Sequence, residues 1–268
     1  MVPAVRWLGL AGAMALAGCQ FEPDHQGTGY RCDSQHRCPD GTECIDMVCV
    51  GAGGDQDDAA AGTGDDASPR ADGLVAYWPM DEANEGAALD ATGRHEATCD
   101  NCPTLESGHQ GGAWRFNGFS QFLRVEDDDA LQLAEGTISV WARFEEMNWG
   151  ALVGKPYGTE DHNSFLVFSD DTLTLRFEVN AGFVDGVEFD LDTWIHVVAT
   201  WEASGGRELR VGGQTSSADD DIVAQYDDQD VLVAVDFDPP DFVSYFRGSL
   251  DELRIYDRVL TPAELDDL

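Results

Sequence analysis

The chain has 268 residues, and its 52 acidic side chains outnumber its 15 Lys and Arg side chains to give a formal net charge of −37. Nucleic-acid phosphates and anionic lipid surfaces repel a protein this acidic, so the composition excludes nucleic-acid binding and electrostatic docking on a membrane. The acidity favours solubility and supplies carboxylates for calcium, but by itself it identifies no ligand.

Residues 1–18 are predicted to be a secretory signal peptide. Arg6 precedes an apolar run of eleven residues, which is too short to span a bilayer as a helix. The ending Leu16-Ala17-Gly18-Cys19 resembles the lipobox of bacterial lipoproteins, which implies cleavage before Cys19 and a lipid on Cys19. Gln20 follows the Cys, and by analogy this favours a place in the cell envelope at the outer membrane. An ordinary signal peptide with an incidental Cys is the alternative.

Residues 19–31 form a polar lead, and residues 32–49 are dense in cysteine. The four cysteines of this segment are Cys32, Cys38, Cys44 and Cys49. An exported segment too short for a hydrophobic core needs covalent cross-links, so two disulfides are expected. Three connectivities are possible. The spacing resembles a truncated EGF-like knot. A zinc site of four thiolates is the alternative, but the spacings exceed the usual pairs and export argues against it.

Residues 50–72 contain six Asp and one Arg and no large apolar side chain after Val50. Such a segment buries too little surface to offset the entropy of ordering it, so a flexible, self-repelling spacer is predicted.

Residues 73–268 are long enough for one all-β domain. Alternation of apolar and polar side chains predicts strands at Ile138–Phe144 and Leu173–Val179, and a hairpin joins the latter to Phe165–Phe168. Ile195–Trp201 is apolar on nearly both faces, which predicts a central strand. Thr261, followed by Pro262 and by Glu264 at the third helical position, predicts a short closing helix with a capping box.

Five segments of this region, in order, resemble laminin-G-like, concanavalin A-like domains. They begin at Gly73-Leu74-Val75-Ala76-Tyr77-Trp78, Gly111-Gly112-Ala113-Trp114, Gly136-Thr137-Ile138-Ser139, Trp194-Ile195-His196-Val197 and Phe246-Arg247-Gly248-Ser249. The resemblance implies a two-sheet antiparallel jelly-roll sandwich whose first and last strands are adjacent. The same fold carries lectins, adhesion modules and glycosidases, so it does not by itself define a function.

The resemblance also implies a structural Ca²⁺ near the junction of the first and last strands. The matching residues are Asp81, Asp251 and Asn117, the last standing where many relatives carry Asp. Asp251 is expected to share a strand face with Leu253 and Ile255. A hard cation would offset the cost of burying a carboxylate there. The alternative is that Asp251 faces solvent or caps a backbone amide.

Catalysis is not expected. Glucanases of this fold carry paired carboxylates on one strand, and the best local match is Glu188-Phe189-Asp190-Leu191-Asp192, for which a solvated acidic face is the simpler interpretation. The sequence contains no Gly-x-Ser-x-Gly elbow, and its six His show no paired metal spacing. His196 is expected to be a satisfied, half-buried strand residue. A glycosidase remains the enzymatic alternative.

The remaining pair, Cys99 and Cys102, is expected to form a small loop disulfide. The ligand is expected to be a glycan or an extracellular protein, with the lipid as the only contact with the membrane; adhesion between proteins and a purely structural envelope role are the alternatives. Candidate rings for a sugar platform are Trp141, Trp149, Tyr157 and Phe183, although packing within the sandwich is an equally good interpretation of each.

Overall fold

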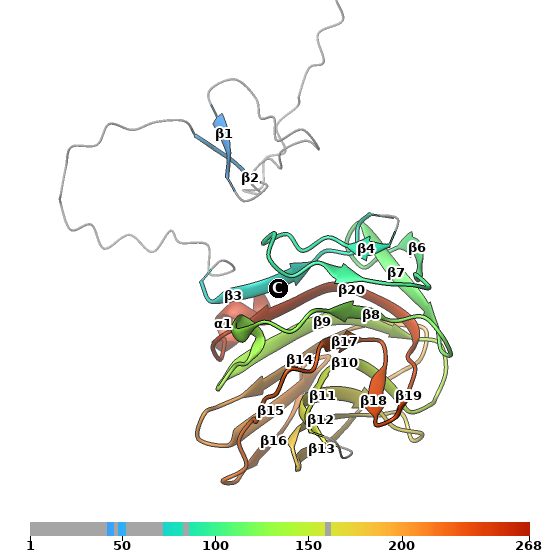
Figure 1. Ribbon diagram of the computed structural model, residues 1–268, viewed down its shortest axis with the longest axis vertical. Coiled ribbons are helices and arrows are strands. Elements are labelled where there is room, and N and C mark those ends of the chain that lie inside the picture. Colours follow the sequence, from blue (N-terminus) through green and yellow to red (C-terminus); the bar gives the residue numbers. More distant parts are fainter. Residues whose placement is uncertain (1–41, 46–47, 52–71, 83–85, 159–161) are drawn as a thin grey trace, which may run out of the picture. The chain divides into compact units, whose positions relative to one another are not determined.

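The computed structural model describes residues 42–45, 48–51, 72–82, 86–158 and 162–268 (Figure 1). The chain divides into two units, residues 1–57 and 58–268. In the first unit, β1 (Thr42–Ile45) pairs with β2 (Val48–Gly51), and Cys44 lies opposite Cys49. The predicted signal peptide, Cys19, the polar lead, Cys32, Cys38 and residues 52–71 of the spacer lie outside the described residues.

The second unit is an all-β sandwich of two antiparallel sheets, as the sequence predicts (Figure 1). We name the first the β20 sheet. Its order is β16 (Gln214–Asp219), β15 (Gly206–Val211), β14 (Trp194–Trp201), β9 (Gly136–Phe144), β20 (Arg247–Tyr256), β7 (Gly112–Asn117) and β6 (Thr104–Ser107), with β3 (Leu74–Trp78) also paired to β20.

The second sheet is named the β11 sheet. Its order is β13 (Gly182–Glu188), β12 (Thr174–Asn180), β11 (Asn163–Ser169), β10 (Gly150–Pro156), β17 (Val231–Val233), β8 (Leu123–Val125), β5 (Ala97–Thr98) and β4 (Ala87–Ala88). A separate hairpin pairs β18 (Asp236–Asp238) with β19 (Asp241–Val243) through Pro239 and Pro240, whose peptide bond is cis. A 3₁₀ turn (Asp129–Leu131) and the helix α1 (Pro262–Asp266) complete the elements.

The strands lie where the apolar alternation predicts them. The first and last strands of the domain, β3 and β20, are adjacent, and β14 lies between β15 and β9 inside its sheet. At α1 the Thr261 hydroxyl accepts the backbone N–H of Glu264, and the Glu264 carboxylate accepts the backbone N–H of Thr261, which completes the capping box.

Aromatic rings fill the space between the sheets. Trp201 of β14 stacks on Phe165 of β11 with ring centroids 5.3 Å apart, so one contact joins the two layers. The buried indole N–H of Trp201 donates to the carbonyl of Leu133, and that of Trp78 donates to the carbonyl of His95. These bonds remove the cost of burying a polar group in the core.

Cys99 and Cys102 form a disulfide, which closes a short turn after β5. Among the described residues, no helix is long and apolar enough to cross a membrane.

Candidate functional site

A groove of ≈ 370 Å³ lies on the outer face of the β11 sheet. Its volume falls within the range of small-molecule sites, about 300–1,000 Å³. The residues that line it are Trp149, His162, Leu166, Phe168, Arg176, Glu178, Ala181, Phe183, Asp236, Asp238 and Ser244.

The floor of the groove follows from the period of two along β11. Phe165 and Val167 point into the core, so Leu166 and Phe168 point outward, where they form a small apolar cluster with Ala151 of β10. Leu166 and Phe168 are only 4% and 8% exposed. A strand that is apolar on both faces therefore has one face in the core and the other under the groove.

Two exposed aromatic rings flank this floor. Trp149, just before β10, and Phe183, on β13, are each 47% exposed. The Trp149 ring stacks on Phe168 with centroids 6.0 Å apart and planes 20° apart. Since Phe168 and Phe183 stand two strands apart, about 10 Å separates them across the sheet. The groove thus offers apolar ring surface at both ends of a polar middle.

The polar middle carries more carboxylates than basic groups. Glu178 on β12 lies directly opposite Phe183, and Asp236 and Asp238 come from β18. The basic side chains of the lining are Arg176 and His162.

Arg176 is already paired within the protein. Its Nε lies 3.4 Å from a carboxylate oxygen of Asp170, which is 3% exposed. Burial acts to raise the pKa of Asp170, but hydrogen bonds from Thr172 and Thr174 and the charge of Arg176 outweigh it and lower the pKa below its ordinary value. Asp170 therefore stays ionised and balances the guanidinium of Arg176.

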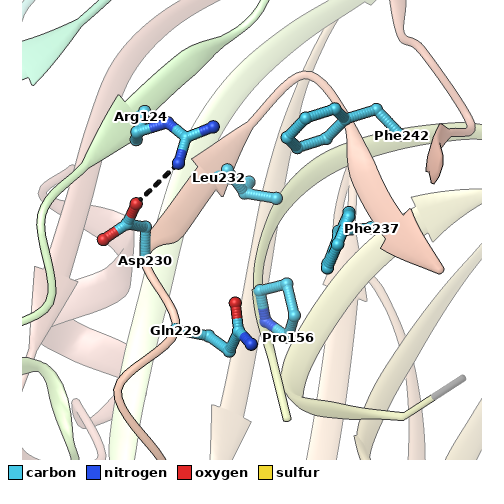
Figure 2. A pocket seen from close by; sticks show the side chains of 7 residues that line it. All are labelled: Arg124, Pro156, Gln229, Asp230, Leu232, Phe237 and Phe242. Carbon is cyan, nitrogen blue, oxygen red and sulfur yellow. Dashed lines mark hydrogen bonds and ion pairs between the residues drawn. The ribbon is translucent and has the colours of Figure 1, made fainter. Parts of the chain in front are cut away.

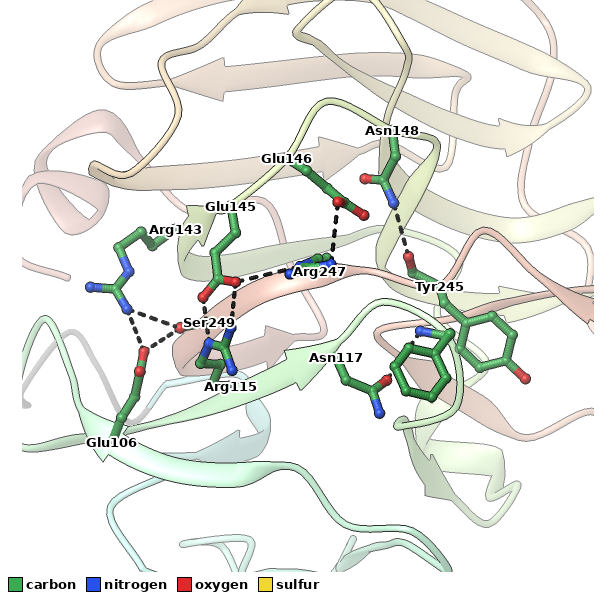
Figure 3. A network of polar contacts seen from close by, with 11 residues as sticks. Glu106, Arg115, Asn117, Arg143, Glu145, Glu146, Asn148, Tyr245, Arg247 and Ser249 are labelled. Carbon is green, nitrogen blue, oxygen red and sulfur yellow. Dashed lines mark hydrogen bonds and ion pairs between the residues drawn. The ribbon is translucent and has the colours of Figure 1, made fainter.

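The loop that carries Trp149 is held by a network of ion pairs (Figure 3). The Glu145 carboxylate accepts two hydrogen bonds from Arg115, at 2.5 and 2.6 Å, and lies 3.6 Å from Arg247. Arg247 in turn lies 3.5 Å from Glu146. The Arg115 hydrogen bond lowers the pKa of Glu145, and burial opposes it.

Asn148, next to Trp149, is fixed from two sides. Its side-chain amide donates to the carbonyl of Tyr245 at 3.3 Å (Figure 3). Its own backbone carbonyl accepts the Ser169 hydroxyl at 2.9 Å. These bonds tie the residue before Trp149 to the end of β11 and to the segment between β19 and β20, and the stacking on Phe168 positions the Trp149 ring before any ligand arrives.

A second, smaller pocket of ≈ 80 Å³ lies beside the β18–β19 hairpin (Figure 2). Arg124 donates to Asp230 at 2.8 Å and lies over the ring of Phe242, 5.7 Å from its centroid. Figure 2 also shows Phe237 facing this space. Its volume is suited to a few water molecules rather than to an organic ligand.

The outer face of the β20 sheet also carries aromatic rings, but these rings are covered. His109 stacks on Trp141 with centroids 3.5 Å apart, and His196 stacks on it at 5.0 Å. His196 comes from β14 and His109 from the turn above β20, on the other side of β9, so the two imidazoles enclose the indole. Arg143 lies 5.4 Å above the ring of Trp194 and donates to Glu106 (Figure 3).

His196 is half-buried and satisfied, since its Nε2 lies 2.8 Å from the Ser139 hydroxyl. Burial, and then the charges of Arg254, Arg210 and His109, lower the pKa of His196 to about 4. Tyr157, the remaining candidate ring, donates its hydroxyl to Gln225 and does not line the groove. Of the four candidate rings, the structure brings only Trp149 and Phe183 to one site.

Asp81 and Asp251 both contact the turn of residues 108–112. Gly112 donates its backbone N–H to Asp81 at 2.7 Å, and Gln110 donates to Asp251 at 2.9 Å. A Cβ on Gly111 would stand 2.1 Å from the Asp81 carboxylate, and φ is +67° there, so the approach requires glycine.

Asp251 does not share a face with Leu253 and Ile255, contrary to expectation. The register of β20 shifts between Asp251 and Arg254, and Glu252 has a φ of 54°. This bulge lets Leu250 and Leu253 both enter the core, and Asp251 points outward beneath the 108–112 turn.

The burial of Asp251 bears on the expected calcium site. One carboxylate oxygen of Asp251 is buried with no hydrogen-bond partner. Burial, with the charges of Glu252 and Asp81, raises the pKa of Asp251 to about 7, against hydrogen bonds from Gln110 and His109. Asp81 and Asp251 would hold a Ca²⁺ that supplies charge balance, with backbone carbonyls as further ligands. The described residues contain no group of three or more His, Cys, Asp or Glu side chains placed to bind a metal.

Asn117 does not belong to this cluster. Its side-chain oxygen accepts the backbone N–H groups of Phe119, Ser120 and Gln121, which makes it the anchor of the β7–β8 turn. It stands at the far end of β7 from Gly112, and five residues of strand correspond to about 16 Å. The structure therefore places the Asn117 side chain apart from the 108–112 turn that Asp81 and Asp251 contact.

Glu188, Asp190 and Asp192 do not form a carboxylate set on one strand. Glu188 is the last residue of β13, and the two Asp residues follow it in the turn before β14. All three are exposed, and Asp192 has a φ of 58°. They lie on the surface outside the groove.

The sequence did not single out the groove residues Arg176, Glu178, Asp236 and Asp238 as site residues. The alternation in Leu173–Val179 does place Arg176 and Glu178 on the outer face, and the apolar outer face of β11 indicates a covered or ligand-binding surface. No local pattern indicates Asp236 and Asp238, because the β18–β19 hairpin reaches the groove from elsewhere in the chain.

The chain belongs to the concanavalin A-like lectin/glucanases superfamily. The family profile Laminin_G_3 matches residues 117–266, more than half of the chain. No curated protein matches the chain.

Similar folds occur among solved structures. Domain 4 of an extracellular arabinanase from Geobacillus stearothermophilus, solved with arabinotriose, has a TM-score of 0.57 and 20% identity over 72% of this chain and 97% of that one. Trypanosoma rangeli sialidase in complex with sialic acid has a TM-score of 0.57 and 16% identity, and the match covers 72% of this chain but only 32% of the sialidase. The binding domain of Paraclostridial mosquitocidal protein 1 has a TM-score of 0.59 and 14% identity, covering 73% of this chain and 51% of that one. These similarities describe the fold.

Proposed function

We propose that the domain is a non-catalytic carbohydrate-binding module whose site is the groove on the β11 sheet. The observation that carries the proposal is the pair of exposed rings, Trp149 and Phe183, in one groove that also has polar lining residues. The arabinotriose complex of the similar arabinanase domain supports it.

The chemistry of a sugar matches this arrangement. The C–H face of a sugar ring is apolar and gains free energy by covering an exposed aromatic ring. Its hydroxyl groups donate hydrogen bonds, and the carboxylates of Glu178, Asp236 and Asp238 accept them. Stacking supplies affinity, and the fixed acceptors orient the ring.

A glycan array probed with the full-length protein tests the proposal. Binding is expected for the wild type, and Phe183→Ala is expected to weaken it about tenfold, since burial of one aromatic face contributes about 1.5 kcal/mol. Phe119→Ala is the matched control, because Phe119 is 70% exposed and lies in the β7–β8 turn, outside the groove. No bound glycan, or equal losses in the two variants, would contradict the proposal.

The same preparations separate binding from hydrolysis. A retaining glycosidase needs two carboxyl groups about 5–5.5 Å apart. If the wild type releases products from a bound oligosaccharide and Glu178→Gln does not, the domain is an enzyme and not a non-catalytic binding module. Capture of an extracellular protein without any glycan would favour adhesion instead.

We further propose that the chain is a cell-envelope lipoprotein that displays this domain through a lipid on Cys19. The Leu16-Ala17-Gly18-Cys19 ending supports the proposal. Two or three acyl chains give stable attachment, since each buried methylene contributes about 0.8 kcal/mol. Mass spectrometry of the mature N-terminus should find an acylated Cys19, and Cys19→Ala should block processing or release the protein from the detergent phase; an unmodified Cys19 would contradict the anchor.

A structural Ca²⁺ held by Asp81 and Asp251 is part of the same proposal. The unpartnered, buried oxygen of Asp251 supports it. The ion would fix the 108–112 turn and take no part in sugar binding.

A further inference from the structure

The two exposed rings of the groove come from opposite sides of four adjacent strands. Trp149 lies just before β10 and Phe183 lies on β13, with β11 and β12 between them (Figure 1). Three strand spacings therefore separate the backbones of these two residues across the sheet, which amounts to about 14 Å. The groove is long relative to a single sugar ring.

The pairing register gives the distance along the groove. Phe183 lies opposite Glu178 on β12, and Glu178 lies opposite Leu166 on β11, so the three form one row across the sheet. Phe168 stands two residues further along β11 on the same face, which adds about 7 Å along the strand to about 10 Å across two strand spacings. The diagonal from Phe168 to Phe183 is therefore about 12 Å long. The Trp149 ring stacks on Phe168 at one end of this diagonal.

The surface between the two exposed rings offers no third ring of this kind. The phenyl and indole rings among the described lining residues are those of Trp149, Phe168 and Phe183. Phe168 is only 8% exposed and Leu166 only 4%, against 47% for each of the outer rings. The imidazole of His162 lies just before β11, at the other end of that strand from Phe168. A ligand therefore finds exposed phenyl or indole surface for stacking at two separated places.

The distance between these places sets the length of the ligand. A single sugar ring has about the width of a phenyl ring, so it covers one aromatic ring at a time. A disaccharide places its second ring directly beside the first and stops short of an aromatic ring about 12 Å away. A trisaccharide spans the distance, and its middle ring lies over the row that contains Leu166 and Glu178.

We propose that the groove requires a chain of at least three sugar units, of which the first and the third stack on Trp149 and Phe183. This inference rests on the proposed sugar-binding function and adds the length of the ligand. The second stacking contact adds affinity because the chain is already held by the first, so the loss of translational freedom is not repeated.

Titrations of the full-length protein with oligosaccharides of increasing length test the inference. The probes are arabinose, xylose and glucose with their linear α-1,5-arabino-, β-1,4-xylo- and cello-oligosaccharides of two to six units. In each series that binds, we expect the trisaccharide to bind about tenfold more tightly than the disaccharide, or more. Each unit beyond the third is expected to add less than about threefold, because no further exposed ring awaits it.

Variants assign this gain to the two rings. Trp149→Ala and Phe183→Ala each leave a single exposed ring in the groove, so the ratio of trisaccharide to disaccharide affinity should fall below about threefold in both. The ratio is measured within one variant, so a smaller folded fraction cancels from it. Phe119→Ala removes a ring that is 70% exposed outside the groove and should keep the ratio of the wild type.

The outcomes separate the two proposals. Equal affinities for the monosaccharide, disaccharide and trisaccharide of a series overturn the length requirement and leave the sugar-binding function standing. A trisaccharide-to-disaccharide ratio that stays at its wild-type value in Trp149→Ala and in Phe183→Ala overturns the assignment to the two rings. Absence of binding to every probe overturns the sugar-binding function itself.

Discussion

The two outer faces of the sandwich carry similar residues in opposite states. On the β20 sheet, Trp141 lies between two imidazoles, and Arg143 covers Trp194. On the β11 sheet, Trp149 and Phe183 keep nearly half of their surface exposed. Aromatic content therefore does not identify the binding face; what matters is whether the protein's own side chains already occupy the rings.

Ion pairs occur on both faces. On the β20 face, Glu145 lies between Arg115 and Arg247 (Figure 3). In the groove, Asp170 balances the guanidinium of Arg176. Ion pairs therefore hold both faces, and the exposure of the aromatic rings is what distinguishes them.

Removing calcium should have the largest effect on thermal stability, through the outer face of the β20 sheet. A cation bound only by the folded state at a hundredfold excess over Kd stabilises it by about 2.7 kcal/mol. In a domain of this size a chelator should lower Tm by roughly 5–10 °C. Differential scanning calorimetry measures the shift, and Asp251→Asn should abolish it. Identical melting curves with calcium and with chelator would rule the site out.

Alanine substitutions of Trp149 and Trp141 test the comparison between the two outer faces directly. Trp149→Ala should weaken glycan binding about thirtyfold, equivalent to about 2 kcal/mol, with little change in stability, because the ring is exposed and central to the site. Trp141→Ala should reduce the free energy of unfolding by about 2 kcal/mol and spare affinity, because its packing partners are internal.

Titration calorimetry and denaturant unfolding of both variants provide the measurements. The comparison between the faces fails if Trp141→Ala abolishes binding in a folded protein, or if Trp149→Ala leaves affinity intact.

Local sequence patterns were sufficient to predict the strands but not the residues of the candidate site. Alternation predicts β9 and β12, and the spacing of Thr261, Pro262 and Glu264 predicts α1, because each depends on neighbours in the chain. The state of Trp141 depends on His109, from a turn 32 residues earlier, and no local pattern contains that contact.

The calcium residues illustrate a second limit. The family resemblance implies that Asp81, Asp251 and Asn117 lie together. In the structure Asp81 and Asp251 both contact the 108–112 turn, whereas the length of β7 places Asn117 about 16 Å from Gly112. The bulge at Glu252 reverses the face of Asp251, and a single extra residue in a strand leaves no periodic signal of its own.

A fall in pH should destabilise the domain through His196, which lies on the outer face of the β20 sheet. The pKa of His196 is about 4 in the folded protein, below its ordinary value of 6.5, because the site favours the neutral ring. Its contribution to stability is therefore fully present above pH 6.5 and is lost as pH falls toward 4. Between pH 7 and pH 5 the loss should be of the order of 1–2 kcal/mol. Unfolding curves of the wild type and His196→Gln should converge as pH falls, and parallel pH profiles would contradict this assignment.

The smallest expected effect concerns the loop that joins the two faces. Glu145 binds Arg115 and Arg247 on the β20 side, and the chain that follows carries Trp149 into the groove. Glu145→Gln should cost about 1 kcal/mol of stability, since it weakens a partly buried charged network. It should also reduce glycan affinity about threefold, because a less ordered Trp149 loses more entropy on binding.

The matched control for this change is Glu264→Gln. Glu264 makes a similar bidentate contact with Arg258 at α1, outside the lining of the groove. The control should lose stability without losing affinity, since no part of the site depends on α1. Equal affinity in the two variants would mean that the loop does not position Trp149 and that the groove is organised by the β11 sheet alone; a loss confined to Glu145→Gln would show that the charge pairing on one face holds the ligand ring on the other.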